Sequence, residues 1–135
     1  MKIEQILFSS AAFAIMAGTA TLADRPQVVG PLPGYKCMVL NLTEQQSMDP
    51  NTRIPVFDRP AADGHQVGIA AGIVAVKDPS HIVDGFTEAL FPTGATVWIK
   101  SDVLRPYHSV SDPTARCVPS KMSNGRSGFD FPRSP

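Results

Sequence analysis

The chain has 135 residues, with 12 Lys and Arg against 12 Asp and Glu, so its formal net charge at pH 7 is zero. A hydrophobic fraction of 43% fits one small globular domain with a modest core. No basic stripe stands out along the chain, which argues against nucleic acid as a partner and against attraction to anionic lipid.

The first 23 residues have the three parts of a secretory signal peptide. Lys2 gives a weakly positive start, residues 6–17 form an apolar run, and Thr21 and Ala23 supply small side chains at the positions read by signal peptidase. Cleavage after Ala20 is the second choice. The alternative is a retained membrane anchor, but the apolar run has only 12 residues, whereas a spanning helix needs about 20. We therefore expect a periplasmic or secreted product of 112 residues with no membrane insertion after cleavage.

Two cysteines, Cys37 and Cys117, lie in the expected mature chain. An even cysteine count in an exported protein predicts a disulfide, and two cysteines allow one internal pairing. A metal pair or a reactive thiol is the alternative, but there is no CxxC motif and no histidine near either cysteine. The bridge would close a loop of about 80 residues, which is worth roughly 4–5 kcal/mol in the chain-entropy model.

The mature chain divides into three segments. Residues 24–35 contain three Pro and two Gly, which predicts an extended leader. Residues 36–117 alternate short apolar runs with turn residues, which predicts an all-β domain of five to six short strands. Residues 118–135 are rich in Gly, Ser and Pro, and we expect a flexible tail, or one laid along the surface by Phe129 and Phe131.

The apolar runs of the central segment are the candidates for these five to six strands. In chain order they cover residues 37–42, 54–57, 66–69, 73–77, 86–91, 95–100 and 105–107, with a polar loop over 43–51 and one 3₁₀ turn over 101–104. So many short strands without an amphipathic helix favour a small closed barrel, because closure removes exposed sheet edges. The disulfide would then join the two ends of the barrel.

Residues 54–107 resemble the bacterial SH3-like domains. Gln66 to Gly72 is similar to the family's hydrophobic-Gly-x-x-x-x-Gly step, Asp84 to Ala89 to its D-G-W-x-x-V strand, and Gly94 to Leu104 to its G-x-x-G-W-V-x-x-x-Y-L ending. The sequence departs from this pattern at Phe86, where Trp is usual, and at Val97, where Gly is usual. The resemblance implies an SH3-like barrel that acts as a binding module, commonly near the cell wall and without catalysis.

Aromatic side chains give the clearest binding signal, since SH3-like folds use aromatic grooves to bind extended peptides. The candidate groove residues are Phe57, Asp58, Arg59, Trp98, Arg105 and Tyr107. The alternative places Trp98 in the core of the barrel.

No catalytic, metal or cofactor site is indicated. His65, His81 and His108 lack the spacing of metal ligands, and no Gly-x-Ser-x-Gly or phosphate-binding loop occurs. We therefore expect a non-enzymatic module that recognises a protein, a peptide or a cell-wall component. A purely structural part of an assembly stays open as a function, and so do two more specific ones. One is an exported enzyme inhibitor acting through residues 58–65 or 78–84, and the other is a hydrolase built on His81 with Asp78 or Asp84.

Overall fold

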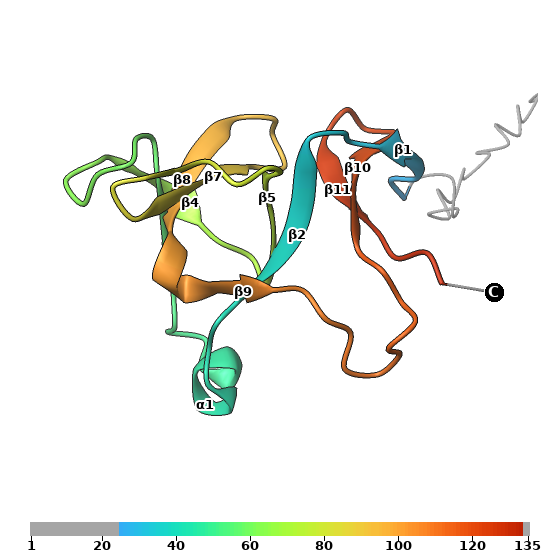
Figure 1. The fold of residues 1–135 in the computed structure, drawn as a ribbon, viewed down its shortest axis with the longest axis horizontal. Helices are drawn as coiled ribbons and strands as arrows, with labels where there is room; N and C mark the ends of the chain where they lie inside the picture. Colours follow the sequence, from blue (N-terminus) through green and yellow to red (C-terminus); the bar gives the residue numbers. More distant parts are fainter. Residues whose placement is uncertain (1–24, 134–135) are drawn as a thin grey trace, which may run out of the picture.

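The computed structural model describes residues 25–133 (Figure 1). The predicted signal peptide, residues 1–23, lies outside the described residues. Two antiparallel sheets supply most of the regular structure of the described part, so the predicted all-β class is confirmed. No helix between residues 25 and 133 is long and apolar enough to cross a membrane.

The larger sheet contains eight strands, and most of them match the predicted apolar runs. They are β2 (Tyr35–Leu40), β3 (Pro55–Phe57), β4 (Gln66–Ile69), β5 (Ile73–Lys77), β6 (Ile82–Val83), β7 (Phe86–Leu90), β8 (Thr96–Lys100) and β9 (Leu104–Pro106). Their order is β4-β3-β8-β7-β5-β2-β9, and β6 pairs with β7. The predicted 3₁₀ turn is present at Ser101–Val103.

The larger sheet curls around one apolar core. Alternate residues of each strand face this core because successive side chains of a strand point to opposite faces. On β8, for example, Val97 and Ile99 belong to the core, and Trp98 between them does not. The buried core residues are Val56, Val74, Val76, Ala89, Val97, Ile99 and Leu104.

The predicted closed barrel is not found. Within residues 25–133, β4 pairs only with β3, and β9 pairs only with β2, so the curled sheet keeps two edges. β9 ends at Pro106, whose missing N–H cannot donate to a further strand. The ladder between β3 and β4 is interrupted by a register shift, which also shortens the pairing at the other edge.

A second sheet, of three strands, forms from the two segments that were expected to be an extended leader and a flexible tail. It has the order β1-β10-β11 and comprises β1 (Val28–Pro31), β10 (Val118–Met122) and β11 (Ser127–Asp130). The expected leader therefore contributes a strand, and residues 118–130 form a hairpin instead of a flexible tail. The hairpin turns at Asn124 and Gly125, where Gly125 has a positive φ of 81° and the Arg126 N–H donates to Asn124 Oδ1 (3.0 Å). The two terminal segments are ordered by pairing with each other across the length of the chain.

The predicted disulfide between Cys37 and Cys117 is confirmed, with an S–S distance of 2.05 Å and a Cα–Cα distance of 6.0 Å. Its role differs from the expected one. Cys37 lies in β2 of the larger sheet, and Cys117 directly precedes β10 of the smaller sheet. The bridge therefore links the two sheets, which lie side by side in Figure 1, instead of joining the ends of a barrel.

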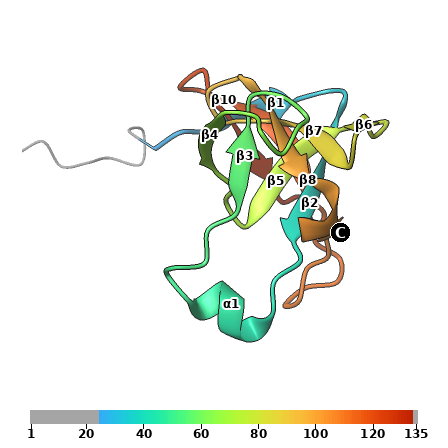
Figure 2. The same ribbon diagram turned by 90° about the vertical axis from the view of Figure 1, so that its left-hand side faces the viewer.

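The segment predicted as a polar loop contains a short helix, α1 (Glu44–Met48). Thr43 caps it: the Gln46 N–H donates to Thr43 Oγ1 (3.1 Å), and the Thr43 N–H donates to Gln46 Oε1 (2.9 Å). This is a capping box, which satisfies two N–H groups that a helix start leaves free. Figure 2 shows α1 projecting away from both sheets, and none of its residues is buried.

Candidate functional site

The six predicted groove residues do not form one groove. Phe57 and Trp98 are direct partners across β3 and β8. The Phe57 ring packs edge to face on Phe86, with 5.7 Å between ring centroids. Trp98 is only 9% exposed, which agrees with the alternative that this ring is a packing residue. These aromatic rings bury one another on the sheet face opposite the main core.

Asp58 and Arg59 organise the loop after β3. Asp58 Oδ1 accepts from the His65 N–H (2.9 Å), which holds the base of the loop together. Arg59 Nη2 donates to the backbone oxygen of Asp63 (3.1 Å) and lies 3.4 Å from Asp63 Oδ1. The side chains of Asp58 and Arg59, which we expected to contact a ligand, therefore bond to residues of their own loop.

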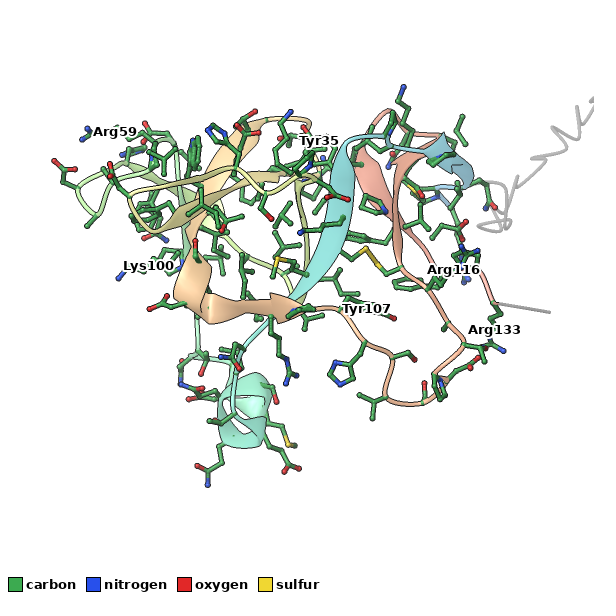
Figure 3. The ribbon with its side chains drawn as sticks, viewed as in Figure 1. Tyr35, Arg59, Lys100, Tyr107, Arg116 and Arg133 are labelled. Carbon is green, nitrogen blue, oxygen red and sulfur yellow. A yellow bond between two sulfur atoms is a disulfide. The ribbon has the colours of Figure 1, made fainter. Side chains whose placement is uncertain are left out.

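Arg105 and Tyr107 lie at the other edge of the larger sheet. β9, which carries Arg105, is separated from β3 by four intervening strands in the sheet order. Figure 3 shows Tyr107 far from Arg59, and the Tyr107 ring packs beside Phe131 at 6.2 Å between centroids. Tyr107 also borders a wide hollow of about 680 Å³ next to the disulfide, together with Lys36, His108 and Arg116.

Glu88, which the sequence did not single out, organises a polar cluster on β7. His81 Nδ1 lies 3.2 Å from Glu88 Oε1, and Lys77 Nζ lies 3.9 Å from Glu88 Oε2. The His81 ring also packs on Trp98, with 5.4 Å between centroids. The carboxylate beside His81 is therefore Glu88, whereas the hydrolase hypothesis required Asp78 or Asp84. The cluster ties the segment before β6 to β7.

Metal ligands are not gathered anywhere in the described part of the chain: no group of three or more His, Cys, Asp or Glu side chains there is placed to hold a metal ion. The three histidines lie apart, His65 in the loop after β3, His81 against Glu88, and His108 beyond β9.

An apolar cavity of about 260 Å³ lies where the two sheets meet, and it is the best candidate for a binding site. Its walls come from the end of β4, the connection to β5 and the first residues of β5, from the end of β7 and the turn after it, and from β11. Val56 on β3 and Val97 on β8, which belong to the main core, form its floor. The main apolar lining residues are Ile69, Ala71, Ile73, Leu90, Phe91 and Phe129. Concave, mostly apolar sites with a few polar groups are typical of ligand pockets.

Two local features shape this cavity. Gly68 leaves room for the Phe91 ring, because a Cβ built on Gly68 would lie 2.5 Å from Phe91 Cζ. Ser127 anchors β11 to the opposite wall: its N–H donates to the Pro92 oxygen (2.9 Å), and its Oγ donates to the Phe91 oxygen (3.2 Å). The cavity is therefore built from four segments that are separate in sequence, at residues 56, 69–75, 90–97 and 126–129.

Arg126 supplies the positive charge at this cavity. It lines the cavity and also a neighbouring pocket of about 290 Å³, which Lys121 borders as well. Within residues 25–133 its guanidinium makes no hydrogen bond or ion pair. The arrangement offers an apolar hollow with an available cation beside it.

Comparison with protein-family models, with curated proteins and with solved structures returns no match.

Proposed function

We propose that this chain is an exported, non-enzymatic binding module that holds an apolar group of a protein, a peptide or a cell-wall component in the cavity between its two sheets. The observation that carries the proposal is the 260 Å³ apolar hollow with the available Arg126 beside it. The resemblance of residues 54–107 to bacterial SH3-like domains supports the same class of function, although the open, curled sheet differs from the closed barrel that the resemblance implies.

Export is supported by two features of different kinds. The disulfide between Cys37 and Cys117 is a bond that persists in oxidising compartments such as the periplasm or the extracellular space. The N-terminal 23 residues have the organisation of a cleavable signal peptide. A binding module placed outside the cytosol would meet envelope proteins and cell-wall fragments first.

A second candidate, the exported inhibitor, is favoured by the loop between β3 and β4. Asp58, Arg59 and Asp63 hold this exposed loop in one shape through the contacts described above. A pre-ordered loop loses little entropy when it enters an active site. Rate assays against lysozymes and secreted proteases test this candidate, and unchanged rates with every enzyme would remove it.

Two variants test the proposed binding site. Ile69→Asp places a carboxylate on the cavity wall at a residue that is already 42% exposed, so folding should survive. Ile82→Asp is the matched control, because Ile82 is 56% exposed and does not line the cavity. Circular dichroism of both variants checks that each one folds.

The binding assay uses a phage-displayed library of short random peptides and a set of soluble peptidoglycan fragments as probes. We expect probes selected on the wild-type protein to bind the control variant unchanged and to lose binding to Ile69→Asp. Burial of a charge in an apolar site costs enough to weaken such a contact at least about tenfold. If no probe binds, or if Ile69→Asp binds as well as the control, the proposed function or its site is wrong.

A further inference from the structure

β4 is an edge strand that borders the cavity. Within the described residues it pairs with β3 alone, and Figure 2 shows it beside β3 at the border of the larger sheet. Edge strands with free backbone groups are templates for the addition of another strand. Val67 and Ile69, two positions apart on β4, are 43% and 42% exposed.

The backbone of Ile69 faces the open side of β4. The Ala70 N–H donates to the Ile54 oxygen (2.8 Å), so the backbone N–H of Ala70 points toward the chain of β3. In an antiparallel ladder, residues that bond to the partner strand alternate with residues whose N–H and C=O point away from it. Pro55 is the register partner of Ile69. Because Pro55 has no N–H to donate to Ile69, this pair fits the position in the ladder where the two residues do not bond to each other. The Ile69 N–H and C=O are therefore available to an added strand.

The cavity lies next to this open edge, because Ile69 and Ala71 form part of its wall. An apolar cavity of about 150 Å³ accepts a molecule the size of benzene. A volume of about 260 Å³ therefore accommodates one large aliphatic or aromatic side chain. A strand added to β4 would present alternate side chains to the same side, so one of them can enter the cavity.

The positive charge of Arg126 favours peptides that carry a negative charge near the cavity. Arg126 lines the cavity, and within the described part of the chain its guanidinium has no partner. Guanidinium groups bind carboxylates through paired, charge-assisted hydrogen bonds. A peptide carboxylate near the inserted side chain is the chemistry that this residue fits best.

We propose that β4 is the docking strand for an extended peptide, that one large apolar side chain of this peptide fills the cavity, and that a peptide carboxylate pairs with Arg126. This inference rests on the proposed function and names its ligand class. β4 has only four residues, so few backbone hydrogen bonds can form, and the cavity and Arg126 supply most of the selectivity.

The test uses a peptide selected in the phage experiment and the purified, oxidised protein. The peptide is synthesised with each backbone amide N-methylated in turn, because a methyl group removes one N–H donor. Two further forms replace a side-chain carboxylate by its amide or the C-terminal carboxylate by its amide, which identifies the source of the negative charge. Titration calorimetry measures each affinity.

Variants of the protein complete the design. Arg126→Glu reverses the charge at the cavity, and Arg126→Lys keeps the charge without the planar fork. Lys100→Glu is the matched control for charge reversal, since Lys100 is exposed on β8 and does not line the cavity (Figure 3). Analytical ultracentrifugation of the wild type and of Ile69→Asp shows whether the free protein dimerises and whether the dimer depends on β4.

We expect N-methylation at alternate peptide positions to weaken binding about tenfold or more, and methylation at the positions between them to change it little. Arg126→Glu and one of the two amide forms should each weaken binding about tenfold, Arg126→Lys should weaken it less, and Lys100→Glu should leave it unchanged.

Other results overturn the inference in separable ways. Equal effects of N-methylation at every position, or at none, contradict strand addition while leaving the cavity as the site. Unchanged affinity with Arg126→Glu contradicts the carboxylate contact. A dimer that dissociates in Ile69→Asp shows that a second copy covers β4. If peptidoglycan fragments bind and no peptide does, the inference of a peptide ligand is wrong, whereas the proposed function still holds.

Discussion

Removal of the disulfide between Cys37 and Cys117 should destabilise this protein more than any single surface change. The bridge spans a sequence separation of 80 residues, and that loop contains nearly the whole larger sheet. In the chain-entropy model, a loop of this length lowers the entropy of the unfolded chain by an amount worth about 4.5 kcal/mol at 25 °C. A domain of this size has a total stability of about 5–15 kcal/mol.

The non-covalent links between the sheets are weaker. Ser127 makes two hydrogen bonds to the turn after β7, each worth about 1 kcal/mol. The Cys37→Ala, Cys117→Ala double variant leaves no free thiol and keeps these contacts. Its melting midpoint, followed by circular dichroism, should fall about 15–20 °C below that of the oxidised wild type, at roughly 4 °C per kcal/mol.

Reduction of the wild-type protein with dithiothreitol is the control, and it should lower the melting midpoint to a similar value. The entropic reasoning would be refuted by a double variant that melts within about 3 °C of the oxidised wild type, since this corresponds to less than about 1 kcal/mol.

Three further substitutions test separate features of the fold. Gly68→Ala forces a methyl group against the Phe91 ring, and overpacking of this kind should lower the free energy of unfolding by about 1–3 kcal/mol, measured by urea denaturation. Thr43→Ala removes the cap of α1; amide hydrogen exchange at Gln46 should accelerate, while the melting midpoint stays within about 2 °C because α1 buries no residue. Glu88→Gln removes the partly exposed ion pair with Lys77 and weakens the contact with His81, and it should cost less than about 1 kcal/mol in the same urea assay.

A contrary result for any of these three variants would show which contact of the structure is wrong. A fully stable Gly68→Ala variant would mean that Phe91 does not pack on β4. A large loss of stability in Thr43→Ala would mean that α1 contacts the sheets. A loss above about 2 kcal/mol in Glu88→Gln would mean that its carboxylate is buried more deeply than its two partners suggest.

Local pattern was enough to predict most strands of the larger sheet. The runs that became β4, β5, β7 and β8 are short, apolar and bounded by turn residues, and each forms a strand at nearly the predicted boundaries. The cysteine pairing was also predictable, because two cysteines allow only one internal bridge. These features depend on neighbouring residues or on simple counting.

The smaller sheet was not predicted, because its strands pair across the length of the chain. Val28 pairs with Met122, and nothing within residues 24–35 alone indicates that partner. A local signal was nevertheless present at the hairpin. Asn124-Gly125 is a strong hairpin dipeptide, although the high Gly and Ser content around it is also typical of a flexible tail. Asp84-Gly85, which turns β6 into β7, carries the same kind of signal.

The candidate site was predicted least well. The aromatic residues suggest a groove, but Trp98 is only 9% exposed. Phe57 is its register partner on β3, and the His81 ring packs on it. The cavity is lined by ordinary apolar residues from β4, β7 and β11, whose meeting depends on how the two sheets pack. Sequence spacing carries no information about that packing.

Nuclear magnetic resonance mapping of a bound peptide tests the inter-sheet cavity most directly. The peptide selected on the wild-type protein is titrated into ¹⁵N-labelled protein, and amide shifts are followed residue by residue. The account predicts the largest shifts at residues 66–69 of β4, the proposed docking strand, and at residues 70–75, 90–93 and 126–129 around the cavity. Shifts confined to the surface around Trp98, or to the hollow beside Tyr107, would contradict it.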